Sequence, residues 1–250
     1  YRNGDVIPAG LTDGEWTSTT SGATAVYGEG SSSCENYSPD IDACDEAQSL
    51  SEYGRLYNWY AVDDARGLCP SGWHVPTDGE WTDLEDYITS QGFSGTEGTA
   101  LKSTYGWNGV GNGTDDFGFS ALPGGYRRYT NGSFGSAGSD GYWWSSSPSG
   151  GVAWFRTLNT SFPGIYRYYD NPRVGFSVRC LRDADYTEVQ GCTDPAYTEY
   201  DASANTDDGS CSTLASTCVS PSMDGHSYSV VEIGDQCWFA ENLRTTTYRN

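Results

Sequence analysis

The chain has 250 residues, of which 34 are acidic and 13 basic, so its formal net charge is −21. A surface this acidic repels phosphate backbones and anionic membranes, which excludes nucleic-acid binding. There is no run of about 18 apolar residues, so the sequence predicts no membrane span. Aromatic residues make up 14% of the chain while hydrophobic residues reach only 36%. This favours short strands and long loops around an aromatic core over disorder.

The first three residues recur at the end of the chain. Tyr1-Arg2-Asn3 reappears as Tyr248-Arg249-Asn250, and residues 238–250 continue smoothly into residues 4–10 when the end is read into the start. Self-similarity at a fixed period is typical of repeat architectures, and a period this long means whole domains. We therefore expect one period of a tandem array in an extracellular polymer or long surface protein.

In chain order, residues 10–53 are rich in Gly, Ser and Thr and are expected to be mostly loop. Residues 54–65 predict a short helix, and a brief strand is expected at 73–75. The clearest helix follows. Thr77 is its expected N-cap, with Glu80 three residues on as a capping box.

After Thr77, the residues Trp81, Leu84 and Ile88 form one apolar stripe at spacings of three and four, as a helix requires. Beyond this helix only short strands and turns are predicted, at 116–128, 141–147, 152–158 and 173–180. In the last of these Val174, Phe176 and Val178 alternate, so that strand is expected to be half buried. One or two helices with a β remainder predict an α+β fold that is mostly β.

Three segments divide the chain. Residues 1–182 are the main part of a domain with long loops, and residues 183–217 are a linker with a small acidic module closed by a disulfide. Residues 218–250 contain two strands around a Gly-Asp turn, which is a hairpin signal. Read across the junction, this hairpin belongs to the same domain type, in the next repeat or a neighbouring subunit.

Eight cysteines in an acidic chain with one lysine indicate four disulfides made outside the cytosol. Position suggests pairing Cys34 with Cys44, Cys192 with Cys211 and Cys218 with Cys237, which leaves Cys69 for Cys180. Zinc is the alternative reading, but the chain has no C-x-x-C pair and only two histidines.

Six motifs resemble the Fibrobacter succinogenes major paralogous domain, in the family's order once the junction is closed, and cover about four-fifths of the chain. They are Glu241-Asn-Leu-Arg-Thr-Thr, Gly54-Arg-Leu-Tyr-Asn-Trp-Tyr-Ala-Val, Cys69-Pro-Ser-Gly-Trp-His-Val-Pro-Thr, Gly118-Phe-Ser-Ala-Leu-Pro-Gly-Gly-Tyr-Arg, Trp143-Trp-Ser-Ser-Ser and Ser177-Val-Arg-Cys. The resemblance implies a C-type-lectin-like fold on secreted or surface proteins of Bacteroidetes and Fibrobacteres. A Cys69–Cys180 bridge would fit that fold, and the family offers no catalytic residues to carry over.

Residues 191–211 resemble a second element, the Cys-Thr-Asp…Asp-Asp-Gly-Ser-Cys module of secreted Bacteroidetes proteins, except that Glu199-Tyr200 replaces its usual Asn-Tyr. The resemblance implies a spacer. Its crowded oxygen donors also predict a calcium site, because a hard cation takes six to eight oxygens. The candidate ligands are Asp194, Asp201, Asn205, Asp207 and Asp208. The alternative is that these residues form Asx turns at loop corners.

Trp143 and Trp144 are adjacent, so on a strand they face opposite sides. We expect one in the core and the other exposed, either at an interface with another copy or stacked on a sugar. Asp115-Asp116 follows a Gly-rich loop that could hold calcium or a sugar, but a solvated turn is favoured because the usual lectin calcium motifs are missing.

No catalytic constellation is present, so the sequence does not predict an enzyme. His74 is expected to be a packed structural residue, and His226 lies in a polar turn. Four sequons, at Asn36, Asn112, Asn131 and Asn159, and the Ser/Thr-rich loops suggest a glycoprotein.

Two functions follow from these observations. The first is a subunit or repeat of an extracellular filament, in which residues 218–250 of one unit complete the fold begun by residues 1–182 of the next by strand addition. Its main partner would be another copy of the chain. The second is a carbohydrate-binding adhesin module on the cell surface that holds glycans with exposed aromatic residues.

Overall fold

The computed structural model describes residues 1–31, 33–184, 189–191, 206–207, 220–223, 225–234 and 236–244. Its helical elements are α1 (Asp13–Ser18), α2 (Glu46–Tyr53), α3 (Trp59–Val62), α4 (Asp78–Ile88), the turn η1 (Thr89–Phe93) and α5 (Glu97–Leu101). The strands of the first domain are β1 (Thr24–Val26), β2 (Cys34–Asn36), β3 (Arg55–Tyr57), β4 (Trp73–His74), β5 (Gly124–Arg127), β6 (Phe134–Ala137), β7 (Asp140–Ser149), β8 (Val152–Asn159), β9 (Phe162–Asp170) and β10 (Leu181–Arg182). Later strands are β11 (Gln190–Gly191), β12 (Thr206–Asp207), β13 (Ser222–Met223), β14 (His226–Ser227), β15 (Val230–Ile233) and β16 (Gln236–Phe239).

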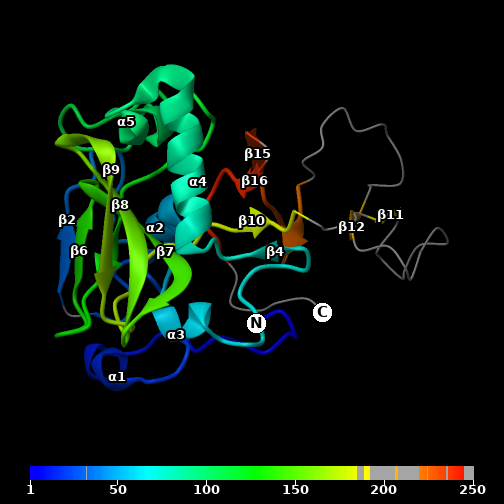
Figure 1. Cartoon of the computed structure of the whole chain (residues 1–250). Coiled ribbons are helices and arrows are strands. Elements are labelled where there is room, and N and C mark those ends of the chain that lie inside the picture. Colours follow the sequence, from blue (N-terminus) through cyan, green and yellow to red (C-terminus); the bar gives the residue numbers. More distant parts are fainter. Residues whose placement is uncertain are drawn as a thin grey trace.

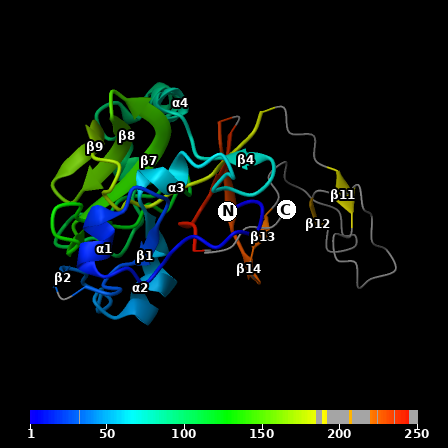
Figure 2. The same ribbon diagram turned by 90° about the horizontal axis from the view of Figure 1, so that it is seen from below.

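Two antiparallel sheets organise the domain. The long strands form the order β7-β8-β9, and a second sheet has the order β15-β16-β10-β4. Helix α4 lies between the two sheets in the view of Figure 1, and α5 lies beside β9. Seen from below, α1, α2 and β1 lie beneath the long strands β7, β8 and β9 in the view (Figure 2). The expectation of a mostly β fold with few helices is confirmed.

The N-terminus lies beside the second sheet in both views (Figures 1 and 2). Arg2 holds it there, because its guanidinium donates to the carbonyl oxygens of Cys69 and Trp73 at 3.1 and 3.0 Å. Tyr1 is buried, and the guanidinium of Arg66 stacks 3.7 Å from the centre of its ring. Both the first residues and the C-terminal hairpin therefore meet β4 and its neighbours.

Strand β7 separates two aromatic clusters of the core, and this corrects the expectation for its tryptophans. Trp144 packs with Tyr57, Phe155 and Phe176, whereas Trp143 packs with the cluster around α4. Their exposed fractions are 0% and 1%. Adjacent residues do face opposite sides of the strand, but both faces of β7 are covered, so neither tryptophan is free for a partner or a sugar.

The alternating segment before Cys180 is also buried on both sides, contrary to the expectation of a half-buried strand. Residues 174–181 are all buried. Isolated bridges join Gly175 to Arg127, Phe176 to Tyr57 and Ser177 to Trp143. The segment crosses three neighbouring elements in succession and does not run along one sheet, which is why both of its faces are covered.

The helix beginning at Thr77 is confirmed with its capping box, and Trp81, Leu84 and Ile88 are buried as its stripe predicts. More than half of the described residues in 10–53 lie outside helices and strands, as expected, but the range also contains α1 and α2, which the sequence patterns do not predict. Residues 54–65 form β3 and then the four-residue α3, a shorter helix than expected. A strand was also expected at 116–128, but most of this range is turn or irregular chain, and only β5 near its end is a strand.

The structure contains the expected disulfides Cys34–Cys44 and Cys69–Cys180. Cys237 is also disulfide-bonded, while Cys192, Cys211 and Cys218 lie outside the described residues. In the part of the chain that is described, no helix is long and apolar enough to cross a membrane.

Candidate functional site

The most extensive candidate site is the joint at which the C-terminal segment docks on the domain. Strand β16 pairs antiparallel with β10, with Trp238 opposite Leu181. Main-chain hydrogen bonds continue the joint: Phe239 donates to Cys180 at 3.3 Å, and Leu243 donates to Val178 at 3.4 Å. On the other side of the segment, Arg55 donates its amide hydrogen to the carbonyl of Leu243 at 3.1 Å. The hairpin therefore completes a sheet that would otherwise end at β10.

The hairpin also supplies side chains to both large core clusters. Trp238 is fully buried, with its ring 5.1 Å from Trp81 and 5.7 Å from Phe119, centre to centre. Phe239 enters the other cluster, 5.0 Å from Trp73 and 4.7 Å from Tyr228. Fully burying a large aromatic side chain stabilises a fold by about 2–3 kcal/mol. These two residues are therefore part of the domain's core even though residues 183–219 separate them from it in sequence.

Asn242 connects the segment to the domain through every polar atom of its amide. Its Oδ1 accepts from the indole Nε1 of Trp143 at 3.2 Å and from Nε of Arg179 at 3.0 Å. Its Nδ2 donates to the carbonyl of Tyr53 at 2.7 Å and to Oγ of Ser177 at 3.2 Å. Burying an amide costs little free energy when all of its donors and acceptors are hydrogen-bonded. Asn242 is 5% exposed, and its four hydrogen bonds therefore offset the cost of removing its amide from water.

Arg179 is the buried cation of the joint, at 1% exposure. Besides Asn242, its guanidinium donates to the carbonyls of Phe119 and Phe239 at 2.7 and 2.6 Å, and to that of Ser120 at 3.2 Å. All four hydrogen bonds go to neutral oxygens. Burial lowers the pKa of Arg179 to about 9, because the negative charges of Asp115 and Glu241 offset only part of the cost of removing the guanidinium from water.

A family model of the Fibrobacter succinogenes major domain matches residues 2–182, which is more than half of the chain. The chain belongs to this family. Comparisons with curated proteins and with solved structures give no match. The family match stops at the end of β10, so the hairpin that completes the sheet of this family domain lies outside the matched span.

His74 contacts the residue that follows the matched span, Asp183. Its Nε2 lies 2.9 Å from Oε1 of Glu80 at the start of α4, and its Nδ1 contacts Oδ1 of Asp183 just after β10. The hydrogen bonds to Glu80 and Asp183 raise the pKa of His74, against the opposite effect of burial. The imidazole thus ties α4, β4 and the exit of β10 together, in keeping with the structural role expected for it.

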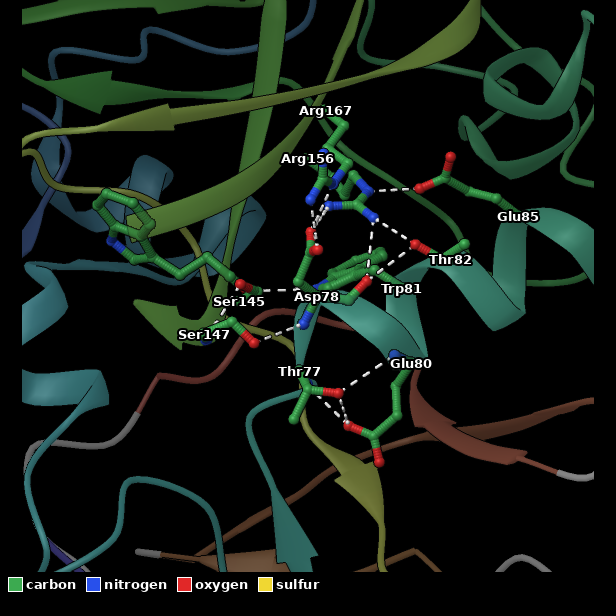
Figure 3. Close-up of polar contacts among 11 residues, drawn as sticks. Thr77, Asp78, Glu80, Trp81, Thr82, Glu85, Ser145, Ser147, Arg156 and Arg167 are labelled. Carbon is green, nitrogen blue, oxygen red and sulfur yellow. Dashed lines mark hydrogen bonds and ion pairs between the residues drawn. The ribbon is translucent and has the colours of Figure 1, made fainter. Parts of the chain in front are cut away.

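Helix α4 of the family domain is fixed to the long sheet by a second charged cluster. Asp78 accepts from Arg156 at 2.6 Å and from both Nε and Nη2 of Arg167 at 2.8 and 2.7 Å, and Arg156 also pairs with Glu85 (Figure 3). Burial raises the pKa of Glu85, although Arg156 opposes this effect. The cluster holds Trp81, and with it one wall of the joint, in place.

The remaining predicted sites are distributed as follows. Asp194, Asp201, Asn205 and Asp208 lie outside the described residues. Asp207 lies in β12, which pairs in parallel with β11. Within the described ranges no group of three His, Cys, Asp or Glu residues is placed to hold a metal ion. The calcium site in the small module therefore stays a prediction.

The turn at Asp115 has a structural role. Asp115 has a left-handed backbone, with φ at 51°, and its carboxylate accepts from both the amide and the hydroxyl of Ser120 at 2.7 Å. His226 contacts Glu241 at 2.8 Å, which joins β14 to the segment after β16. Arg179 and Asn242 both lie in motifs of the family, but the sequence alone assigns them no role, because their partners are far away in sequence.

Proposed function

We propose that the chain is a subunit or repeat of an extracellular polymer in which the C-terminal segment of one unit completes the domain of the next. The observation that supports this most directly is the insertion of Trp238, Phe239 and Asn242 into the core of the family domain. A segment that fills a core and adds a strand makes a strong joint whichever chain supplies it.

The contacts of the joint do not specify which chain supplies the segment. In the structure, the hairpin docks on the domain of its own chain. Residues 183–219 connect the two parts, and exchanging an element of this kind between identical chains preserves every contact. A head-to-tail exchange that does not close into a ring gives an open fibre. The disulfides fit an oxidising, extracellular setting for such a fibre.

The proposal also includes a C-type-lectin-like fold for the family domain and a spacer role for residues 191–211.

The polymer is tested by the intact mass of native material after full reduction and denaturation. A mass many times 27.1 kDa would identify a tandem-repeat polypeptide. A mass near 27.1 kDa, with native assemblies seen by light scattering, would identify separate subunits that exchange hairpins. A chain of that mass that stays monomeric at all concentrations would contradict the proposal.

A second experiment locates the joint. Chains labelled with heavy nitrogen and unlabelled chains are mixed, dissociated in denaturant with disulfides intact, reassociated and cross-linked. Cross-links between a heavy hairpin and a light β10 or β4 are expected if units complete one another. Cross-links confined to single isotopes would show that each hairpin returns to its own domain.

A specific surface favours carbohydrate binding as the alternative function. On β9, Tyr169 is 59% exposed. On the same face of the sheet, the ring of Trp154 lies between Tyr169 and Arg167, with the guanidinium 3.6 Å from its centre. Exposed aromatic faces can stack on sugar rings, and a neutral glycan avoids the repulsion that an acidic one would meet from a chain of net charge −21.

Calorimetric titration with neutral plant-fibre oligosaccharides tests this alternative. Tyr169→Ala should abolish binding, whereas Tyr37→Ala is the matched control, because Tyr37 is similarly exposed at 48% but belongs to another part of the surface. Equal loss in both variants, or no binding by the unaltered chain, would remove this alternative.

A further inference from the structure

The joint has a polar centre that an ordinary apolar joint does not need. Arg179 and Asn242 are both buried, and each would lose partners if the C-terminal segment left. Two of the four oxygens that surround the guanidinium, Oδ1 of Asn242 and the carbonyl of Phe239, come from the segment. A segment that filled the joint without the asparagine would leave the buried guanidinium without one of its hydrogen bonds, which is unfavourable.

The side chain at position 242 is defined by two opposite requirements. Toward Arg179 and Trp143 it must accept, and toward Tyr53 and Ser177 it must donate. Aspartate could accept from Arg179 but could not donate to the carbonyl of Tyr53. Leucine could do neither, and glutamine would move the amide outward by one methylene. Asparagine alone meets both requirements at this length.

The apolar part of the joint sets the spacing. Trp238 fills the cluster around α4, and Asn242 reaches Arg179 four residues later. Gly54 admits the backbone of the segment, because a Cβ there would lie 2.9 Å from Cβ of Asn242 and 3.0 Å from the carbonyl of Leu243. The joint therefore requires three features of the segment at fixed positions: a tryptophan, a backbone that passes close to Gly54, and a side-chain amide.

We infer that the joint is a sequence-selective recognition site for segments of the form Trp-Phe-x-x-Asn-Leu, and that Arg179 selects the asparagine. The partner that fits is the C-terminal segment of this chain or of a second copy. The identity of the supplying chain rests on the proposed function, but the selectivity applies to a segment from either source. Apolar hairpins without the asparagine would be rejected by the unmet hydrogen bonds of Arg179.

A double-mutant cycle in the full chain tests the selection. Hydrogen exchange of the amides of Phe239 and Leu243 reports opening of the joint, and Asn242→Leu and Arg179→Met should each accelerate it on the order of 10- to 100-fold. Because the two side chains satisfy one another, the double variant should exchange much more slowly than the product of the two effects predicts. Asn242→Asp should open the joint less than Asn242→Leu but more than the unaltered chain. Asp83→Asn, on the exposed side of α4, is the control and should change nothing.

Effects that simply multiply in the double variant would overturn the inference, as would equal exchange in Asn242→Asp and Asn242→Leu. Variants that fail to fold are identified by loss of exchange protection in β7 and β8, and the cycle is then measured with Arg179→Lys and Asn242→Ser. Strong coupling in a chain that is always monomeric would support selective recognition and refute the polymer. Polymers that incorporate Asn242→Leu hairpins and unaltered hairpins equally would support the polymer and refute selective recognition.

Discussion

Nε2 of His74 lies 2.9 Å from Oε1 of Glu80, although the histidine belongs to β4 and the glutamate to the first turn of α4. The same carboxylate closes the capping box with Thr77, accepting from its amide at 2.7 Å. Burial alone would raise the pKa of Glu80, but the hydrogen bonds from His74 and Thr77 lower it to about 2. One carboxylate thus fixes both the start of the helix and the strand beside it.

This pairing predicts that the stability of the fold decreases both at alkaline pH and at strongly acidic pH. The pKa of His74 is raised above its usual 6.5, so its contribution is complete below that value and is lost as pH rises through the folded pKa. The lowered pKa of Glu80 means that its contribution is complete above 4.5 and is lost as pH falls toward about 2. Urea midpoints should therefore fall from about pH 5.5 to about pH 8.5, and His74→Gln should flatten this part of the profile. An unchanged slope in the variant would assign the alkaline loss to other groups.

The charged cluster of Figure 3 predicts very different effects for its two arginines. Arg156 is 1% exposed and bonds Asp78 and Glu85, so Arg156→Met would leave the partly buried Glu85 without its arginine and Asp78 with Arg167 alone. We expect a loss of about 3–5 kcal/mol in unfolding free energy. Arg167 contacts the same Asp78, but its side chain is 45% exposed, and Arg167→Met should cost less than about 1 kcal/mol. Similar losses in chemical denaturation would contradict the importance given to burial.

The two disulfides predict unequal stabilisation. Cys69 and Cys180 are 111 residues apart, whereas Cys34 and Cys44 are 10 apart. Loop-closure entropy in the unfolded chain makes the long bridge worth about 5 kcal/mol and the short one about 3 kcal/mol. Replacing each pair with serine and measuring urea unfolding under oxidising conditions tests the order. A larger loss from the Cys34–Cys44 pair would show that native-state contacts dominate over chain entropy.

The capping box is a local signal that places a helix in this chain. Thr77 and Glu80 gave α4 correctly, yet the same six residues, Thr-Asp-Gly-Glu-Trp-Thr, occur at 12–17 and form α1 with its own capping box. This first copy was missed because no apolar stripe follows Trp16. The repeat of the hexapeptide was nonetheless a usable signal, and its second tryptophan, like its first, is buried.

What the sequence could not give is the coverage of both strand faces and the polar centre of the joint. Trp143 and Trp144 alternate as a strand predicts, but only the three-dimensional arrangement puts a cluster on each side. Asn242 bonds residues 63 to 189 positions away, and no local pattern encodes such contacts. The hairpin itself was readable, whereas its attachment to β10 of the same chain appears only in the structure.

Close backbone contact at the joint gives the last prediction. Gly54 and Gly92 both have positive φ, at +73° and +98°, so alanine at either position is strained. That strain costs about 1–3 kcal/mol and is larger at Gly54, whose ψ of −140° at this φ only glycine ordinarily adopts. Only at Gly54 would the new Cβ meet Asn242 and Leu243 within 3.0 Å, while at Gly92 nothing lies within 4 Å. Overpacking of this kind adds about 1–3 kcal/mol.

Gly54→Ala should therefore destabilise the chain more than Gly92→Ala, measured by urea unfolding, and the additional loss should appear as faster hydrogen exchange at Leu243. Gly92→Ala carries backbone strain without a steric contact, so the exchange of Leu243, and not the stability loss alone, reports steric exclusion at Gly54. If both variants lose the same stability and the exchange of Leu243 is unchanged, the segment adjusts to the extra methyl group. The backbone approach at Gly54 would then not contribute to recognition.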